Sequence, residues 1–512
     1  MASLTICRGS RKTVCEAEAG TCLADILRDS GDAPAMPCGG NGKCGKCRVL
    51  ASGNLSAPDD NERTLLGDAP EGTRLACMTR ITGDAEVTVG GDEIDTLSWA
   101  EMPEVKPDGR GFGAAVDIGT TTVAVRLYDC TDGRPAAEEL AGNSQAPYGA
   151  DVISRIGRAD NGDHTAITGA IRSQLTEMAD KCMKKAGVSE LTKAVVTGNT
   201  TMLHFYEGLD SHGIAVAPFT AASLFGCRSA YRLCDTDTYL PPCIGAYIGA
   251  DIVCAVMASG MANHPEKTSL LADIGTNGEV VLMHDGKLIC CSTAAGPAFE
   301  GAGLRMGMRA SAGAVTGIAL LPNGSADVTV MGDCDASGIC GSGAIDAIRA
   351  MMESGAIDGS GRIPDTCPGP GEIVVEDGLP SWRIPGTHVS VTQKDVRQIQ
   401  LAKSAICAGI RTLLDYAGVR PEDVSSFYIA GGFGHSMNAG SAAAIGLFPG
   451  ELLDVVHVIG NGALAGASML LLSGEYTAEA ERIRSLAEEI ELSGNQKFMD
   501  LYVDGMFFGE GD

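Results

Sequence analysis

Four cysteines near the N-terminus, Cys38, Cys44, Cys47 and Cys77, have the type and spacing of a metal-cluster site. The first three lie in a glycine-rich segment, residues 37–47, that can wrap a small inorganic cluster and turn backbone N–H groups toward its sulfides. The C-x5-C-x2-C pattern with a distant fourth cysteine is close to the plant-type spacing of a [2Fe–2S] cluster, with one extra residue in the first gap. Zinc and free thiols are the weaker alternatives, because structural zinc usually takes two close ligand pairs and only Cys44 and Cys47 form one.

A second chemical pattern, Asp-Ile-Gly-Thr, occurs twice, at residues 117–120 and 273–276. Each copy follows an apolar run and precedes a second apolar run, which indicates an internal duplication of an α/β unit. Glycine lets the backbone approach an anion, and turn amides and threonine hydroxyls donate hydrogen bonds to phosphate oxygens. An aspartate at a strand end can hold Mg²⁺ through water, because Mg²⁺ retains much of its hydration. Two facing copies would therefore clamp one polyphosphate.

These two loops supply most of the residues that we expect in a nucleotide site. The residues expected to act in catalysis are Asp117, Thr120, Asp273 and Thr276. The residues expected to bind the nucleotide from the same loops are Gly119, Thr121, Thr122, Gly275 and Asn277.

Three other segments are candidates for the same cleft. A predicted strand at 425–430 ends in Gly431, Gly432 and, two residues later, Gly434, a loop that can lie flat against a nucleoside and its α-phosphate. Another predicted strand ends at Gly198 and Asn199, where lining of the cleft and an ordinary helix N-cap are both open interpretations. In residues 295–301, a turn with a solvated Glu300 carboxylate is favoured over a metal or water ligand.

The elements that position the cysteines form a small N-terminal domain, residues 1–91. Strands are predicted at 2–7, 12–17, 46–52, 73–77 and 85–90, with a helix that begins at Thr21 as N-cap and a short helix at 59–67. Two strands, a helix, a cluster loop and returning strands follow the order of the β-grasp fold, and the whole segment resembles [2Fe–2S] ferredoxins.

The rest of the chain is predicted to be a linker followed by a duplicated α/β region. Residues 92–112 contain Pro103 and Pro107 and no hydrophobic period, which predicts a semi-rigid linker. Residues 113–512 alternate predicted strands and helices, and Thr392 is predicted to cap a long helix at 392–416. Further strands are predicted at 193–197 and 455–459, and further helices at 148–158, 164–186, 250–260 and 340–354.

Composition limits the partners and the compartment. The net charge of the 512 residues is −27, an acidic balance that disfavours nucleic acid and anionic membranes as partners. No apolar run approaches a membrane span, and the N-terminus shows no apolar signal core. The 19 cysteines in a chain without an export signal do not indicate disulfides. We therefore expect a cytoplasmic protein, and one suited to a cell with little oxygen.

The order of the motifs resembles two known groups. The two Asp-Ile-Gly-Thr copies and residues 431–434 are similar to the phosphate-1, phosphate-2 and adenosine motifs of the acetate and sugar kinase, Hsp70 and actin superfamily. With the ferredoxin-type N-terminus, nearly the whole chain resembles the reductive activators of corrinoid proteins. That resemblance implies a β-grasp domain followed by a duplicated, RNase H-like ATPase. It also implies the cofactors [2Fe–2S], ATP and Mg²⁺.

The resemblance implies a specific activity as well. The cluster domain would take an electron from an external low-potential donor and pass it to the Co(II) corrinoid of a methyltransferase protein, giving Co(I), with ATP driving the step. The cluster ligands carried over are Cys38, Cys44, Cys47 and Cys77, and a homodimer is plausible. The alternatives are an ATP-driven electron donor to another low-potential enzyme, a redox-gated nucleotide sensor, and a metabolite kinase with a regulatory ferredoxin.

Overall fold

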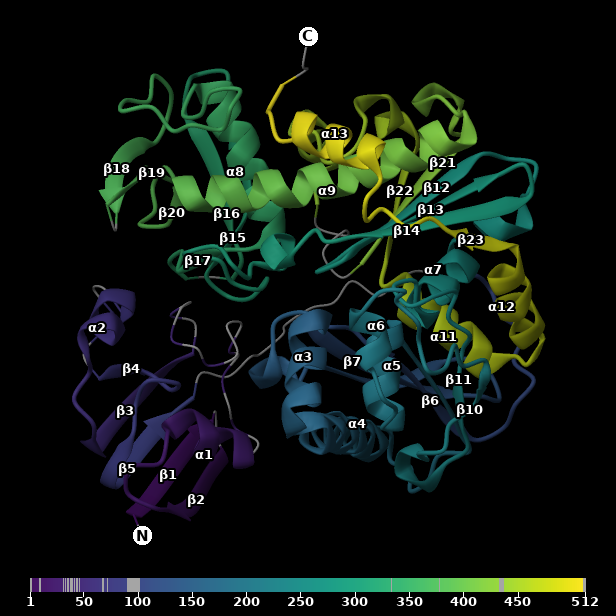
Figure 1. Ribbon diagram of the computed structural model, residues 1–512, viewed down its shortest axis with the longest axis horizontal. Coiled ribbons are helices and arrows are strands. Elements are labelled where there is room, and N and C mark those ends of the chain that lie inside the picture. Colours follow the sequence, from purple (N-terminus) through teal and green to yellow (C-terminus); the bar gives the residue numbers. More distant parts are fainter. Residues whose placement is uncertain are drawn as a thin grey trace.

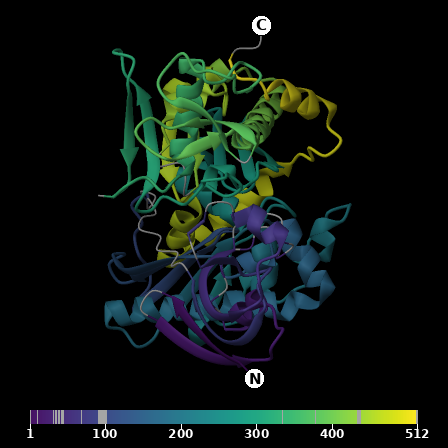
Figure 2. The same ribbon diagram turned by 90° about the vertical axis from the view of Figure 1, so that its left-hand side faces the viewer.

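The computed structural model describes residues 2–509 apart from 9–10, 31, 33, 35, 37–39, 41, 43–44, 46, 67–68, 71, 90–101, 333, 377 and 432–436. The predictions for Cys38, Cys44, Gly432 and Gly434, and residues 92–101 of the predicted linker, therefore lie outside the described residues. A small N-terminal domain lies against one lobe of a larger two-lobed body (Figures 1 and 2). In the part of the chain that the structure describes, no helix has the length and apolar character needed to cross a membrane. The expected cytoplasmic location stays a prediction.

The N-terminal domain has the predicted β-grasp order. Its five-stranded sheet runs β2-β1-β5-β3-β4, with β1 and β5 parallel and the other neighbours antiparallel. Leu4 and Ile6 on β1 and Leu23 and Leu27 on α1 are buried, so the core lies between the sheet and this helix. The elements are β1 (Ala2–Arg8), β2 (Arg11–Ala17), α1 (Leu23–Asp29), β3 (Arg48–Leu55), α2 (Asp60–Leu66), β4 (Thr73–Leu75) and β5 (Ile81–Thr88).

The predicted N-cap of the first helix is wrong by one residue. Cys22, not Thr21, is the N-cap of α1, and its side chain makes no capping hydrogen bond. The Thr21 carbonyl accepts a hydrogen bond from the N–H of Ile81 at 3.1 Å, and Cys22 pairs with Arg80 in an isolated bridge. Pairing with the sheet, rather than a side-chain cap, therefore fixes where α1 begins.

The larger body consists of two lobes whose sheets share an order of five strands, β11-β9-β6-β7-β8 in the first and β22-β21-β12-β13-β14 in the second. In the first lobe the sheet runs β10-β11-β9-β6-β7-β8, and in the second it runs β22-β21-β12-β13-β14-β23. The central strands β6 and β12 are each antiparallel to the next strand in sequence and parallel to a later one, β9 or β21. The two Asp-Ile-Gly-Thr copies lie at the ends of β6 and β12, which are equivalent strands of the two sheets. The duplication predicted from the motifs is therefore a duplication of the fold. The division of the chain at residues 91 and 112 remains our proposal.

The first lobe holds β6 (Phe112–Ile118), β7 (Thr122–Asp129), β8 (Pro135–Gly142), η1 (Ala146–Tyr148), α3 (Val152–Arg158), η2 (Ala159–Asp163), α4 (His164–Ala186), β9 (Lys193–Gly198), α5 (Thr200–Glu207), α6 (His212–Ala215), β10 (Cys227–Arg228), η3 (Leu233–Asp235), β11 (Thr238–Leu240), α7 (Ala250–Ser259) and η4 (Met261–Asn263).

The second lobe and the C-terminal elements are β12 (Ser269–Ile274), β13 (Gly278–His284), β14 (Lys287–Thr293), η5 (Pro297–Glu300), β15 (Ala314–Leu320), β16 (Ala326–Val330), β17 (Gly338–Ile339), α8 (Gly341–Ser354), β18 (Glu372–Glu376), β19 (Leu379–Arg383), β20 (Ser390–Thr392), α9 (Gln393–Ala417), η6 (Pro421–Asp423), β21 (Ser426–Ala430), α10 (Ala439–Ala444), η8 (Gly450–Val455), β22 (Val456–Gly460), α11 (Gly462–Leu472), α12 (Glu475–Leu486), β23 (Ala487–Glu489) and α13 (Gln496–Asp504).

Two helices join the lobes. Buried residues of α7 and α11 share one apolar cluster with Ala115 of the first sheet and with Leu271 and Val281 of the second. The helices approach closely at Gly466, where a Cβ atom would lie 2.2 Å from the carbonyl oxygen of Cys254. Because glycine alone permits this approach, α7 and α11 form a tightly packed connection on which the two sheets are mounted.

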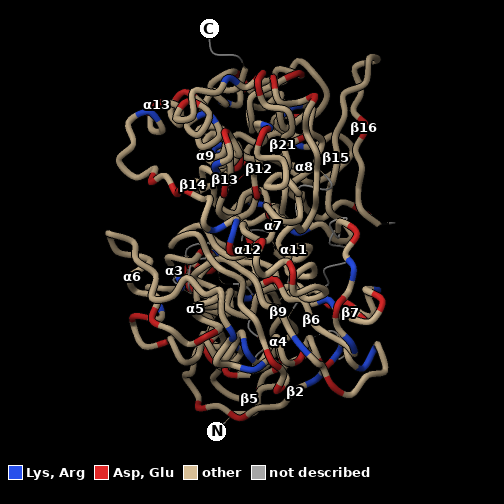
Figure 3. Tube along the Cα trace, turned by 90° about the vertical axis from the view of Figure 1, so that its right-hand side faces the viewer, with Lys and Arg blue, Asp and Glu red and all other residues tan. Residues whose placement is uncertain are grey.

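Other local predictions agree with the structure. Thr392 caps α9 through a capping box with Asp395, as predicted. Acidic residues are spread over both lobes rather than confined to one segment (Figure 3). The acidic balance therefore belongs to the body as a whole.

Candidate functional site

The two lobes form an open cleft that contains most of the predicted nucleotide residues. Both Asp-Ile-Gly-Thr loops, the start of α8 and the end of β21 contribute to its walls. The predicted residues that line it are Asp117, Gly119, Thr120, Thr121, Thr122, Asn199, Asp273, Gly275, Thr276, Asn277 and Gly431. Gly198 is not among the lining residues, although its neighbour Asn199 is.

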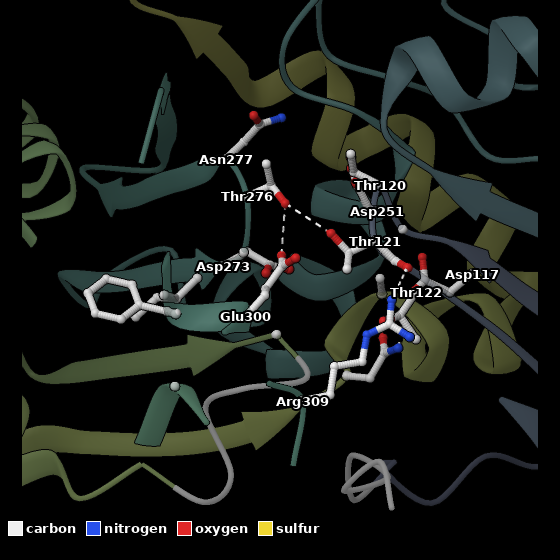
Figure 4. A pocket seen from close by; sticks show the side chains of 18 of the residues that line it. Asp117, Thr120, Thr121, Thr122, Asp251, Asp273, Thr276, Asn277, Glu300 and Arg309 are labelled. Atoms are coloured by element: carbon white, nitrogen blue, oxygen red, sulfur yellow. Dashed lines mark hydrogen bonds between the residues drawn. The ribbon is translucent and has the colours of Figure 1, made fainter. Parts of the chain in front are cut away.

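The two loops face each other across the cleft. The hydroxyl oxygens of Thr121 and Thr276 are 3.2 Å apart, although the residues come from different lobes (Figure 4). Thr276 also donates a hydrogen bond of 3.0 Å to Oε1 of Glu300, on η5. Hydroxyls converge from both loops, which is the arrangement that a clamp on one polyphosphate requires.

Four of the carboxyl groups that line this cleft are those of Glu279, which is buried, and of Asp117, Asp251 and Asp273, which are partly buried. Burial raises the pKa of Asp117 to about 6, although the side chain of Asn461 donates to it at 2.9 Å. Burial and then the charges of Asp117 and Glu300 raise the pKa of Asp273 to about 7. Burial, with the neighbouring carboxylates, also holds the pKa values of Asp251 and Glu279 well above their usual range.

These carboxyl groups fit a hydrated divalent cation. The charges of neighbouring carboxylates act on Asp251, Asp273 and Glu279, so a bound cation would relieve this repulsion. Within the described residues, no three carboxylate, histidine or cysteine side chains converge closely enough to ligate one metal ion directly. The fit is therefore to Mg²⁺ that keeps most of its water shell, as Mg²⁺ does when it also binds phosphates.

Two asparagines connect the cleft to helix N-termini. Asn199 caps α5 through the N–H of Met202 and donates its amide N–H to the Thr120 hydroxyl at 3.0 Å. Asn461 caps α11 through the N–H of Leu464 while its amide holds Asp117. The two interpretations left open for Asn199, helix cap and cleft wall, therefore both apply.

Glycine is required where the adenosine-type loop begins. Gly431 has a φ of +104°, and a Cβ atom there would lie 2.8 Å from the carbonyl oxygen of Ile274 and 2.9 Å from Oδ1 of Asp273. Gly198, with a φ of +155°, would similarly place a Cβ 2.7 Å from the carbonyl oxygen of Ile118. Gly198 thus permits close packing behind the first loop rather than contact with a ligand.

The interpretation of Glu300 as a solvated carboxylate is wrong. It lines the cleft, accepts from Thr276, and has a buried Oε2 atom without a hydrogen-bond partner among the described residues. Nη1 of Arg309 is likewise buried and unpartnered there, while its Nη2 donates to the Thr121 carbonyl at 3.1 Å. An unpaired cationic N–H and an unpaired carboxylate oxygen at one cleft indicate a ligand with both anionic and cationic parts, such as a metal-bound polyphosphate.

Several cleft residues were not predicted from the sequence. Asn461 follows a predicted strand, in the same position relative to its strand as Asn199, so the strand-end pattern could have found it. Asp251, Glu279 and Arg309 have no such signal, because only the tertiary fold brings them to the loops. Arg155 is fully buried behind the first loop and donates to the Thr120 carbonyl at 2.5 Å.

Two of the four predicted cluster ligands, Cys47 and Cys77, are among the described residues. The Sγ atoms of Cys47 and Cys77 are 3.3 Å apart, although the residues are distant in sequence. The hydrogen bond from Cys47 lowers the pKa of Cys77 to about 7, against the effect of burial. Two close thiols in an environment that favours a thiolate fit the ligands of an iron–sulfur cluster.

Helix α2 braces the cluster loop from outside. Asn61 donates to the Gly42 carbonyl at 3.0 Å, and Arg48 links the carbonyls of Gly45 and Leu65 at 3.1 and 2.9 Å. The loop is therefore held to a helix on one side and to the sheet on the other.

The raised carboxyl pKa values predict a pH-dependent cation affinity. The pKa values of Asp117 and Asp273 are higher in the folded protein than in the unfolded chain, so their protonated forms stabilise the fold. This contribution is complete below pH about 4 and is lost as the pH rises through about 6 and about 7. A divalent cation must displace those protons, so we expect Mn²⁺, used as a Mg²⁺ probe, to bind at least about tenfold more weakly at pH 5.5 than at pH 8. Free Mn²⁺ can be counted by electron paramagnetic resonance. Equal affinity at both pH values would exclude these carboxyls as the cation's partners.

Duplicated sheets with facing phosphate-type loops, joined to a β-grasp cluster domain, define a ferredoxin-linked protein of the acetate and sugar kinase, Hsp70 and actin class. Family models agree along the chain: a 2Fe-2S iron-sulfur cluster binding domain matches residues 6–82, the RACo middle region matches 112–264, and the C-terminal domain of RACo, the ASKHA domain, matches 267–512. The chain belongs to the RACo family. The predicted fold class and family are thus confirmed.

Individual relatives cover most of the chain. The corrinoid activation enzyme RamQ of Eubacterium limosum is 34% identical over 426 residues, which are 78% of this chain and 70% of that protein. The [Co(II) methylated amine-specific corrinoid protein] reductase of Methanosarcina barkeri is 24% identical over 434 residues, 77% of this chain and 76% of that one. A solved structure of a reductive activator for a corrinoid, iron-sulfur protein superposes with a TM-score of 0.72 and 28% identity, covering 99% of both chains.

Proposed function

We propose that the protein is an ATP-dependent reductive activator of a corrinoid-binding methyltransferase protein. It would transfer one electron from a [2Fe–2S] cluster to the Co(II) corrinoid, giving Co(I) and an oxidised cluster, which an external low-potential donor reduces again. The observation that carries the proposal is the Thr121–Thr276 contact between facing loops in a chain that also brings Cys47 and Cys77 together. The activities in the names of relatives aligned over more than three quarters of the chain support it.

The roles of the cleft residues follow from their positions. The turn amides and hydroxyls of Thr120, Thr121 and Thr276 would hold the phosphates from both lobes. Asp117 and Asp273 would hold hydrated Mg²⁺, which neutralises charge on the phosphates when it is bound. Arg309 reaches the Thr121 carbonyl from the second lobe, so its unpaired Nη1 would donate a hydrogen bond to the terminal phosphate.

Closure of the two lobes would couple the nucleotide to the electron step. Because the loops belong to different lobes, a polyphosphate bound by both stabilises the closed arrangement by its differential affinity. Hydrolysis removes one phosphate from this bridge and weakens it. Cys38, Cys44, Cys47 and Cys77 would hold the cluster that supplies the electron. A homodimer remains part of the proposal.

The test combines all components without oxygen. The protein is mixed with a Co(II) corrinoid protein, a strong chemical reductant and Mg-ATP, and the Co(I) absorption band is followed. We expect the band to appear only when both ATP and this protein are present. Equal Co(I) formation without ATP, or none at all, would overturn the proposal. A phosphorylated small molecule would instead favour a kinase, and nucleotide binding without turnover would favour a sensor.

A further inference from the structure

The cluster domain touches the first lobe at one aromatic residue. The guanidinium carbon of Arg28, in the last turn of α1, lies 5.6 Å from the centre of the Tyr148 ring, at the end of η1. The Arg28 side chain is only 18% exposed, although it lies in the last turn of a helix of a small domain. Figure 1 shows α1 on the side of the cluster domain that faces α3. This is a cation–π contact across the boundary between the two domains.

Charges of both signs surround the contact on both sides. Burial raises the pKa of Tyr148, and the charges of Arg28, Asp163, Asp29 and Arg158 also act on its hydroxyl. Arg28 is paired with Asp25 at 2.9 Å within α1, and Arg158 is paired with Asp163 at 2.6 Å on the lobe. Each domain therefore offers an alternating charge pattern to the other, which favours one docking arrangement over others.

Tyr148 is also connected to the nucleotide cleft through one buried side chain. Arg155 donates to the Gly149 carbonyl at 3.0 Å and to Oε1 of the Gln145 side chain at 3.3 Å, so it contacts the backbone after Tyr148 and the Gln145 side chain before it. The same guanidinium donates to the Thr120 carbonyl at 2.5 Å, in the first phosphate-type loop. Arg155 is 1% exposed, and burial lowers its pKa to about 10. A buried cation that holds both segments fixes their relative position.

The hydrogen bond from Arg155 to the Thr120 carbonyl fixes the orientation of the peptide unit between Thr120 and Thr121, which matters for phosphate binding. It holds the Thr120 carbonyl toward Arg155, behind the loop. The opposite end of that peptide unit, the N–H of Thr121, is thereby kept on the side of the loop away from Arg155, where Thr121 lines the cleft. A loop whose amides are already oriented loses less freedom when an anion binds.

We propose that docking of the cluster domain on Tyr148 and nucleotide binding in the cleft reinforce each other through Arg155. The docked domain keeps η1 in place, η1 and Gly149 keep Arg155 in place, and Arg155 orients the Thr120–Thr121 peptide toward the phosphates. By linkage, nucleotide that prefers this loop conformation must hold the cluster domain in its docked position. The presence of bound nucleotide would thus control how often the cluster domain leaves its docked position. This inference rests on the proposed nucleotide binding, but not on corrinoid reduction.

The chain offers a matched pair of arginines for the test. Arg28→Ala removes the cation at Tyr148. Arg63→Ala is the control, because Arg63 is also in the last turn of a seven-residue helix, paired with an aspartate three residues earlier, and its side chain is 62% exposed. Binding of Mg²⁺ with a non-hydrolysable ATP analogue is measured by calorimetry on the full, cluster-loaded chain. Hydrogen exchange of residues 23–29 and 145–158 is followed by mass spectrometry.

We expect Arg28→Ala to weaken analogue binding roughly three- to tenfold and Arg63→Ala to leave it unchanged. In the parent protein the analogue should slow exchange in residues 23–29, and in Arg28→Ala that protection should be lost. A second variant, Tyr148→Leu, should weaken binding by a similar factor, and the double variant by no more than either single one. Unchanged affinity in Arg28→Ala, or protection of residues 23–29 that survives it, would overturn the coupling. Failure of the parent protein to bind the analogue would refute the proposed function itself.

Discussion

Replacing Asp273 with asparagine is expected to lower ATP hydrolysis and ATP-dependent Co(I) formation by about 100-fold or more, with the visible spectrum of the cluster unchanged. Asp273 is the second-last residue of β12, is partly buried, and has the charges of Asp117 and Glu300 as electrostatic neighbours. Asparagine keeps the size and shape of the side chain, while the charge that attracts the cation is lost. The expected loss is therefore in the chemical step rather than in folding.

The control for this substitution is Asp346→Asn. Asp346 is a partly buried carboxyl of the same lobe whose pKa is also raised by burial, but it lines a separate cavity beside α8 and α10. Its loss should leave ATP hydrolysis within about twofold of the parent rate. Retained ATP-dependent reduction in Asp273→Asn would show that the two duplicated loops do not form the nucleotide site.

The structure could be predicted best where a ligand-binding motif lies between two apolar runs that predict strands. Each Asp-Ile-Gly-Thr copy stands between two strands, so its place at a strand end followed from local pattern, and duplication implied that the ends would face each other. The contact between Thr121 and Thr276 is the structural counterpart of that inference. Pattern also sufficed for α9, because a capping box is contained within four residues, Thr392 to Asp395.

The parts that could not be predicted depend on tertiary packing. Arg309 lies in a loop without a motif, and only the approach of the two lobes brings it to Thr121. A carboxylate on a turn is usually solvated, which is why the sequence favours that interpretation for Glu300; its place in the cleft, with a hydrogen bond from Thr276, depends on how η5 packs against the second loop. Arg155 carries no local signal at all, since its partners lie on two segments, Thr120 after β6 and the pair Gln145 and Gly149 that flanks η1.

Replacing Glu62 with methionine is expected to destabilise the cluster domain by about 3–5 kcal/mol and to cause loss of the cluster under conditions in which the parent protein keeps it. Glu62 is 1% exposed and forms a two-fold pair with Arg74, with both N–O distances 2.9 Å. Its Oε1 also accepts from the N–H of Leu75 at 2.8 Å and from the Thr79 hydroxyl at 3.2 Å. Those two residues stand two positions before and after Cys77, so Glu62 fixes the segment that carries this ligand.

The double variant Glu62→Met, Arg74→Met separates the ion pair from simple packing. Removing Glu62 alone leaves the guanidinium of Arg74, which is 8% exposed, buried without its carboxylate, whereas removing both leaves no uncompensated charge. The double variant should therefore recover at least about half of the lost stability, although the hydrogen bonds to Leu75 and Thr79 stay absent. Urea unfolding followed by the visible absorbance of the cluster measures the cluster domain, and binding of an ATP analogue reports on the two lobes in the same samples. A single Glu62→Met variant that keeps its cluster at the parent's urea midpoint would show that Cys77 is positioned without Glu62. If the double variant is no more stable than the single one, the hydrogen bonds rather than the charge pair hold the segment.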